Sequence, residues 1–213
     1  MTDEIADYLR QHPEFFNQHA ELLAELRVPH PHGTHAVSIT ERQVMALRDK
    51  ARLLENKLAE LIQFGEENDG ISEKMHRLSL SLMAAPDLAT LLGALNTHLL
   101  DGFGVPHSAL RLWDVHSAEE LAALATVSEG LRAQVDTQRR PVCGPLPYAE
   151  AAAWFGESAS HLRSFATIPL RASCTLGLLI LASEEPRRFY PEMGILYLER
   201  LGQLIGAAVA RMA

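Results

Sequence analysis

Residues 164–183, SFATIPLRASCTLGLLILAS, decide the fold class because they predict two strands, SFATIPL and CTLGLLILAS. Side chains of a strand alternate between its two faces. Phe165 and Thr167 therefore share one face of the first strand. The other face carries three apolar residues, Ala166, Ile168 and Leu170. The apolar run of residues 176–182 is too short to span a bilayer and indicates a buried strand.

Further strands and helices alternate around this stretch. The segments HSALRLWD (107–114) and LAALATVS (121–128) predict two more strands. Helical spacing of apolar residues occurs in residues 71–85, 86–104 and 190–212. A sheet that needs cover on both faces indicates a layered α/β or α+β domain.

The last of these helices has Pro191 in its predicted first turn. Gly202 and Gly206 would let it lie close against a sheet or a partner helix. Its apolar stripe consists of Leu198, Leu201, Ile205, Ala208 and Met212.

Residues 1–37 predict one or two short helices and then a hinge rich in proline and histidine. Pro29 and Pro31 stop the helical pattern. Three histidines near these prolines resemble a metal-binding cluster: His30, His32 and His35. Zinc needs ligands held on a frame together with a fourth partner. Prolines and a glycine separate these three, so we expect a hinge and no metal site.

Residues 38–70 predict a long amphipathic helix that resembles a coiled coil. Ser38 and Glu41 fit a capping box at its start. Gly65 and Gly70 mark a point where the helix could kink or change phase. Residues 71–213 then form the third part of the chain, the mixed helix and strand domain.

The seam of this helix has spacings of three and four residues, as in a left-handed coiled coil. Its members are Val44, Leu47, Ala51, Leu54, Leu58 and Leu61. With Val44 as position a, Lys50 at g and Glu55 at the following e would face each other across a parallel dimer. Met45, Leu53 and Ile62 lie outside the seam, which favours a wider bundle over an isolated pair.

Composition excludes several classes of protein. The net charge is −8, and the longest basic clusters are the pairs 139–140 and 187–188, so we expect no direct binding of nucleic acid. Two cysteines are too few for a disulfide framework. The first residues lack the apolar region of a secretory signal. We therefore expect a cytoplasmic protein in a reducing setting, without membrane contact.

The strand faces suggest a candidate ligand pocket. In residues 107–114, Ala109, Arg111 and Trp113 share one face, and Leu110 and Leu112 share the other. A face with arginine, aromatic and threonine side chains is typical of a mostly apolar pocket with a few polar groups. The candidate pocket residues are Arg111, Trp113, Cys143, Tyr148, Phe165 and Thr167. The structural alternative is a tryptophan packed under a helix, with Arg111 reaching the rim.

The cysteines allow two interpretations. Cys143 lies in RPVCGPLPY, a loop with proline and glycine, and Cys174 opens the strand CTLGLLILAS. They are either small, half-buried apolar residues or a redox pair, which would need a lowered thiol pKa. The first interpretation is favoured.

Sequence motifs of ordinary enzymes are missing. The chain contains no G-x-S-x-G, no phosphate-binding glycine loop and no His-Glu-x-x-His. An enzyme is therefore disfavoured, though not excluded, and no cofactor is identifiable.

The chain resembles the bacterial DUF484 family, which has a GAF-like domain. The resemblance rests on YLRQHPEFFNQHAELLAEL, VPHPHGTHAVSITERQVMALRDK and EEND, and on the C-terminal ATIPLRASCTLGLLILASEEPRRFYPEMGILYLERLGQLIGAAVARM. It implies a central antiparallel sheet with helices on both faces over residues 71–213. It also implies a homodimer through the N-terminal and C-terminal helices, and a pocket for a small molecule.

We thus expect a dimeric sensory or regulatory module that binds an unidentified small molecule and signals through its N-terminal helices to a separate protein partner. One alternative is a thiol-based redox sensor, or an enzyme similar to methionine sulfoxide reductases, that uses Cys143 and Cys174. Another is a ligand-free scaffold whose pocket is filled by Trp113 and Phe165.

Overall fold

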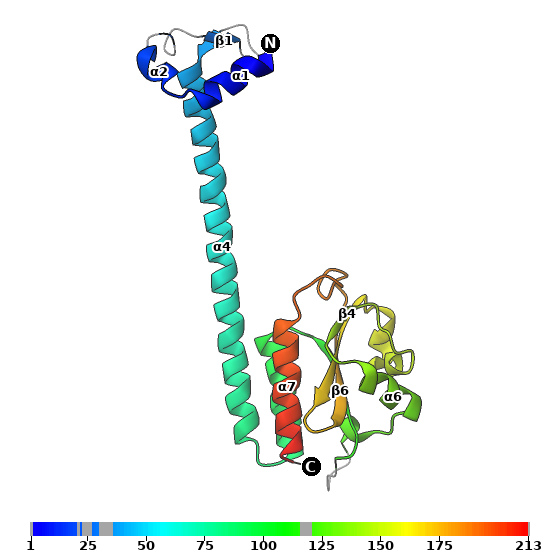
Figure 1. The fold of residues 1–213 in the computed structure, drawn as a ribbon. Coiled ribbons are helices and arrows are strands. Elements are labelled where there is room, and N and C mark those ends of the chain that lie inside the picture. Colours follow the sequence, from blue (N-terminus) through cyan, green and yellow to red (C-terminus); the bar gives the residue numbers. More distant parts are fainter. Residues whose placement is uncertain (1, 21, 23–26, 30–35, 116–120, 213) are drawn as a thin grey trace. The chain divides into compact units, whose positions relative to one another are not determined.

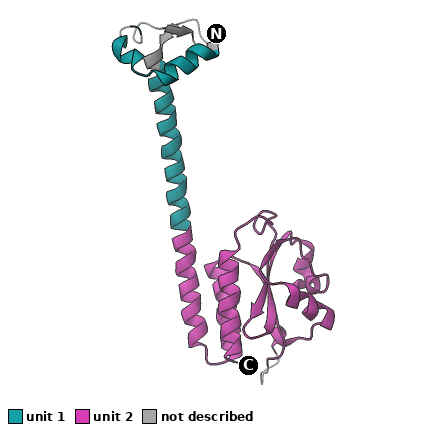
Figure 2. Ribbon diagram, viewed as in Figure 1, with its two compact units in different colours: residues 1–67 teal, residues 68–213 magenta. Residues whose placement is uncertain are grey.

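The computed structural model describes residues 2–20, 22, 27–29, 36–115 and 121–212. The chain divides into two compact units, residues 1–67 and residues 68–213 (Figure 2). Figure 1 shows their helices and strands. Among the described helices, none is long and apolar enough to cross a membrane.

The N-terminal unit contains two short helices and a small ladder. The helices are α1 (Thr2–Gln11) and α2 (Phe15–Gln18). Strands β1 (Arg27–Pro29) and β2 (Ala36–Ser38) pair antiparallel, with Val28 opposite Val37. Strands of three residues carry too little alternation to be recognised in a sequence, and this ladder was missed. His30, His32 and His35 lie outside the described residues.

Helix α4 runs from Ile39 to Ala84 and passes Gly65 and Gly70 without a break. It begins immediately after Ser38, although the side chains of the expected capping box lie outside the described residues. Its predicted seam is open to solvent: the four leucines and the valine are 41–65% exposed. In a single chain these apolar side chains therefore keep about half of their contact with water.

The C-terminal unit is built on a four-stranded antiparallel sheet with the order β3-β6-β5-β4. The strands are β3 (His107–Leu112), β4 (Val142–Gly144), β5 (Ser164–Arg171) and β6 (Thr175–Ser183). The predicted antiparallel sheet is therefore confirmed. The two strands of the opening sequence stretch, β5 and β6, are neighbours at its centre.

The prediction of a strand over residues 121–128 was wrong. This segment contains the short 3-10 helix η2 (Ala122–Leu124), and its remaining residues are irregular. Leu121 and Leu124 pack against the core at helical spacing. The three alanines give little support to a strand, because alanine is depleted in strands.

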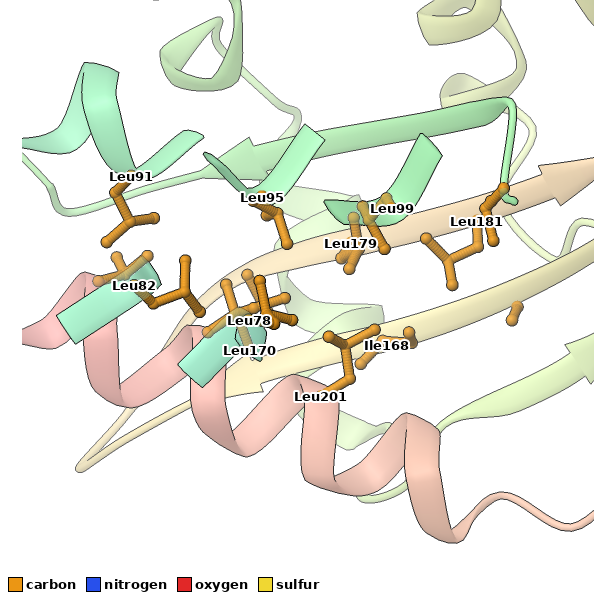
Figure 3. Packing of buried hydrophobic residues seen from close by; sticks show 14 of the residues in the cluster. Leu78, Leu82, Leu91, Leu95, Leu99, Ile168, Leu170, Leu179, Leu181 and Leu201 are labelled. Carbon is orange, nitrogen blue, oxygen red and sulfur yellow. The ribbon is translucent and has the colours of Figure 1, made fainter. Parts of the chain in front are cut away.

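Helices cover both faces of the sheet, as predicted (Figure 1). One face is covered by the end of α4, by α5 (Leu88–Thr97) with the π-turn η1 (His98–Gly102), and by α7 (Leu196–Ala210). The other face is covered by α6 (Glu129–Thr137) and the 3-10 segment η3 (Glu150–Ser160). Figure 3 shows leucines of the core between the first of these faces and its helices, among them Leu78, Leu91 and Leu179, pointing toward one another.

The C-terminal helix packs closely on β5, as its glycines predicted. A Cβ atom on Gly206 would stand 2.5 Å from the carbonyl oxygen of Arg171, and one on Gly202 would stand 2.7 Å from a methyl group of Ile168. Only glycine permits this approach without a shift of the backbone or of a neighbour. Pro191 is not in the first turn, since α7 begins five residues later at Leu196.

Candidate functional site

The sheet face under α6 and η3 collects five of the six candidate pocket residues. Arg111, Trp113, Phe165 and Thr167 share this face, as strand alternation predicted. Tyr148 joins them from the loop after β4. Strand alternation therefore predicted which side chains of β3 and β5 lie together on this face.

Most of this face is packed core. Trp113 is buried and Phe165 half-buried, and both pack with Leu178 and Ile180 of β6. The Phe155 and Phe165 rings meet edge to face, with their centroids 6.0 Å apart. These aromatic side chains fill the space between the sheet and its helices, so Trp113 and Phe165 do not form the floor of a hollow.

Thr167 and Tyr148 belong to a buried hydrogen-bond network around Gln138. The Gln138 side-chain amide donates to the carbonyl oxygen of Thr167 at 2.9 Å and to its hydroxyl at 3.1 Å. The Tyr148 hydroxyl donates to the Gln138 side-chain oxygen. Burial raises the pKa of Tyr148, which keeps the phenol protonated as a donor. The network satisfies polar groups that would otherwise be costly to bury.

Arg111 lines an open groove along the outer edge of β3, whereas Tyr148 lines a smaller hollow of about 210 Å³ between α6 and the start of η3. The groove has a volume of about 350 Å³, within the range of small-molecule sites. Its walls are apolar residues of α5, β3 and η2 together with Trp154, and Asn96 and Ser108 add polar groups. We call this hollow the Arg111 groove. Leu121, Ala123 and Leu179 are other members of its lining.

The guanidinium of Arg111 is held over an aromatic ring. Its central carbon lies 4.8 Å from the ring centroid of Trp154, and its Nη1 donates to the Leu110 carbonyl oxygen at 2.8 Å. Burial lowers the pKa of Arg111, although an arginine stays charged in proteins. Among the described residues that line the groove, Arg111 alone carries a charge. An anionic group would therefore meet a partly desolvated cation, and the described lining residues include no carboxylate that would compete with it.

Cys143 does not join the other candidates. It lies in β4, not in a loop, and packs in the opposite core with Ala166, its partner in register. Cys174 does not open β6 but lies exposed in the turn before it. About 16 Å of β5 separates Ala166 from this turn. A disulfide needs Cα atoms within about 7 Å, so the two cysteines are too far apart for one in this structure.

The sequence missed most of the Arg111 groove. Trp154 lies in a 3-10 segment that carries no strand or helix signal, and the walls from α5 and η2 come from distant parts of the chain. The contact between Arg111 and Trp154 cannot be predicted from the sequence, because the two residues are 43 positions apart. The two adjacent aromatic residues at 154–155, half-buried in the structure, are the sequence feature that could have pointed to this part of the groove.

Comparisons with known proteins agree with this architecture. The model of a family described as "Protein of unknown function, DUF484" matches residues 1–213. The chain is 28% identical to proteins described as "Uncharacterized protein YigA" from Salmonella typhimurium and Escherichia coli, each over 97% of this chain and 90% of the relative. Its fold is similar to the GAF domain of a Coxiella burnetii phosphoenolpyruvate-protein phosphotransferase, with a TM-score of 0.51 and 17% identity over 67% of this chain and 94% of that chain. The C-terminal unit thus has a GAF-like fold.

Proposed function

This chain belongs to the DUF484 family, and we propose that it is a dimeric regulatory module whose GAF-like domain binds a small molecule with an anionic group in the Arg111 groove. The observation that carries this proposal is the position of Arg111. It is a partly buried cation in a groove of about 350 Å³ whose other described lining residues are uncharged.

The groove indicates the chemistry of its ligand. Leucines and alanines line most of its length, and Trp154 closes one end beside Arg111. Such a surface favours an apolar or planar body, while the guanidinium favours a carboxylate or a similar anion. Asn96 and Ser108 can form hydrogen bonds that orient the ligand. A small amphipathic anion fits all three features.

The seam of α4 supports pairing with a second copy of this chain. Its leucines are exposed along about four turns of a single helix, a pattern that parallel coiled coils bury. The placement of Lys50 and Glu55 supplies opposite charges across such a dimer. Leu196 of α7 is also exposed, in agreement with a contribution from the C-terminal helix.

Regulation requires that the ligand favour one of two arrangements of the paired helices. The last turns of α4 supply Met75, Leu78 and Leu82 to the core that α5 and the sheet share, and α5 also lines the Arg111 groove. A shift of α5 on ligand binding would therefore press on α4. Because the sequence lacks motifs for an enzymatic output, the signal would pass to a separate protein.

The thiol-based alternative has weaker support. Burial raises the pKa of Cys143, whereas a reactive cysteine needs a lowered pKa. The scaffold alternative draws support from the aromatic residues Trp113 and Phe165, which pack in the core on this face of the sheet. It does not account for a desolvated arginine beside an open groove.

A thermal-shift screen of carboxylate-containing metabolites tests the proposal. Wild-type protein should show a rise in melting temperature with at least one compound, because binding to the native state stabilises it. The Arg111→Met variant keeps much of the apolar stem and removes the charge, so the same compound should no longer stabilise it. Arg132→Met is the matched control, since Arg132 stacks on Trp113 outside the groove.

Two results would count against this function. One is a screen in which no anionic compound stabilises the wild-type protein. The other is a compound that stabilises the wild type and Arg111→Met equally, because its binding would then owe nothing to the guanidinium.

A further inference from the structure

A second hollow lies toward the edge of the sheet opposite β3, next to the part of β5 that β4 leaves unpaired. Strand β4 pairs only with residues 165–167 of β5. Beyond it, Ile168, Pro169 and Arg171 line a cleft of about 360 Å³. The remaining walls are residues 139–141 and Glu199, Gly202 and Gln203 of α7. We call this hollow the arginine cleft.

The charge of the arginine cleft is opposite to that of the whole chain. Its lining includes the guanidinium groups of Arg139, Arg140 and Arg171 and one carboxylate, Glu199, which leaves a net charge of about +2 at the cleft. The chain as a whole carries −8. A local concentration of cations in an acidic protein raises the local concentration of anions.

Arg171 is fixed in place by its Nη2, and its buried Nε has no partner among the described residues. Its Nη2 donates to carbonyl oxygens at the end of α6, those of Val135 at 3.2 Å, Asp136 at 2.6 Å and Gln138 at 3.2 Å. Its Nε is buried and has no acceptor among the described residues. Buried donors are nearly always paired, so this N–H group needs an acceptor that the described residues do not provide.

Arg139 and Arg140 are free to turn toward a ligand. Both are exposed. The Nε of Arg140 lies 3.5 Å from a carboxylate oxygen of Glu199, a long contact for an ion pair. The Arg140 side chain is 78% exposed, so solvent screens this long contact and weakens it, although Glu199 is half-buried. A stronger anion can therefore replace Glu199 as the partner of Arg140.

We propose that the arginine cleft binds a small molecule through a phosphate group. A phosphate ester carries about −1.5 to −2 charges near neutral pH, which matches the net charge of the cleft better than a single carboxylate does. Its three terminal oxygens accept several hydrogen bonds at once, as three guanidinium groups require. The volume exceeds the need of the phosphate alone and leaves room for an attached body. The site is separate from the Arg111 groove, which lines β3 at the opposite edge of the sheet.

Isothermal titration calorimetry of the full chain tests this proposal, with inorganic phosphate and glycerol 3-phosphate as probes at constant ionic strength. Both should bind the wild-type protein. The double variant Arg139→Gln/Arg140→Gln should bind each probe at least about tenfold more weakly, since two charge-assisted contacts are lost. The double variant Arg163→Gln/Arg187→Gln makes the same change of charge at exposed arginines outside the cleft and should bind like wild type.

The two probes separate the sources of the phosphate group. Tighter binding of glycerol 3-phosphate means that the cleft also contacts the body of an ester, and equal binding means that recognition ends at the phosphate. Absence of binding by both probes overturns the proposal, as does equal weakening in the two double variants. Amide chemical shifts provide an independent measurement: phosphate should move the amide signals of residues 139, 140, 168, 170 and 171, and shifts confined to other residues would contradict the assignment.

Discussion

The exposed seam of α4 leads to a sharp prediction for Leu58→Glu. Leu58 is the fifth of the six seam residues and is 59% exposed in the single chain. Pairing of two copies would bury this remaining surface. A glutamate at the same place would bring two carboxylates toward each other at the centre of the dimer.

The expected cost follows from the exposed fraction. Complete burial of a leucine side chain contributes about 1.5–3 kcal/mol. The 59% still available to the partner therefore contributes about 1–2 kcal/mol per chain, or about 2–4 kcal/mol for the two copies. At about 1.4 kcal/mol for each factor of ten, the dissociation constant of the dimer should rise about 30-fold to 1,000-fold. Repulsion between the new carboxylates adds to this effect.

Sedimentation equilibrium of the full chain measures that constant directly. Leu53→Glu is the matched control, because Leu53 lies on the same helix with 58% exposure but outside the seam. It should weaken the dimer much less than Leu58→Glu. Both variants should keep the melting temperature of the GAF-like domain, since neither side chain belongs to its core. A wild-type protein that stays monomeric, or two variants with equal effects, would refute pairing through this seam.

Three further changes in the C-terminal unit have outcomes set by packing and burial. Gly206→Ala should lower the free energy of unfolding, measured by urea denaturation, by about 1–3 kcal/mol, because its Cβ would collide with the backbone of β5. Gly93→Ala is the control: this glycine has open space around it, so the substitution should raise the free energy of unfolding by about 0.5–1 kcal/mol. Equal effects of the two substitutions would contradict the close approach of α7 to the sheet. Tyr148→Phe should lower the free energy of unfolding by about 1–2 kcal/mol at neutral pH, because the hydrogen bond to Gln138 is lost. Burial raises the pKa of Tyr148 in the folded protein, so above about pH 10 the phenol of the unfolded wild type ionises first and the wild type loses stability. The variant should lose less stability over this pH range, and identical pH profiles of the two proteins would contradict the prediction. Iodoacetamide should modify exposed Cys174 at least about tenfold faster than buried Cys143, as measured by mass spectrometry of the peptides, and similar rates would show that Cys143 is accessible.

Alternation and helical spacing predicted the parts of the fold in which one local pattern decides the structure. The faces of β3 and β5 follow from period two, and the buried face of Met75, Leu78 and Leu82 follows from period 3.6. Glycines in the last helix predicted its close packing on the sheet. Each of these features depends on neighbouring residues, so a single sequence contains the necessary information.

The candidate site depended on longer-range structure and was predicted only in part. Which face Arg111 occupies could be predicted, but its groove is built from α5, η2 and Trp154, which meet only in the folded chain. Cys143 was grouped with the pocket because the three-residue strand β4 gave no signal of its alternation. The hollow lined by Arg139, Arg140 and Arg171 was also missed, since Arg171 stands 31 positions beyond Arg140 and nothing in the sequence brings them together.

Native mass spectrometry of the purified full chain tests the central claim most directly, because it reports pairing and ligand retention in one spectrum. The account predicts a species at twice the 23.5 kDa chain mass that carries an added small molecule, and loss of that molecule in Arg111→Met with the dimer retained. A monomer without added mass, from protein purified under gentle conditions, would contradict it.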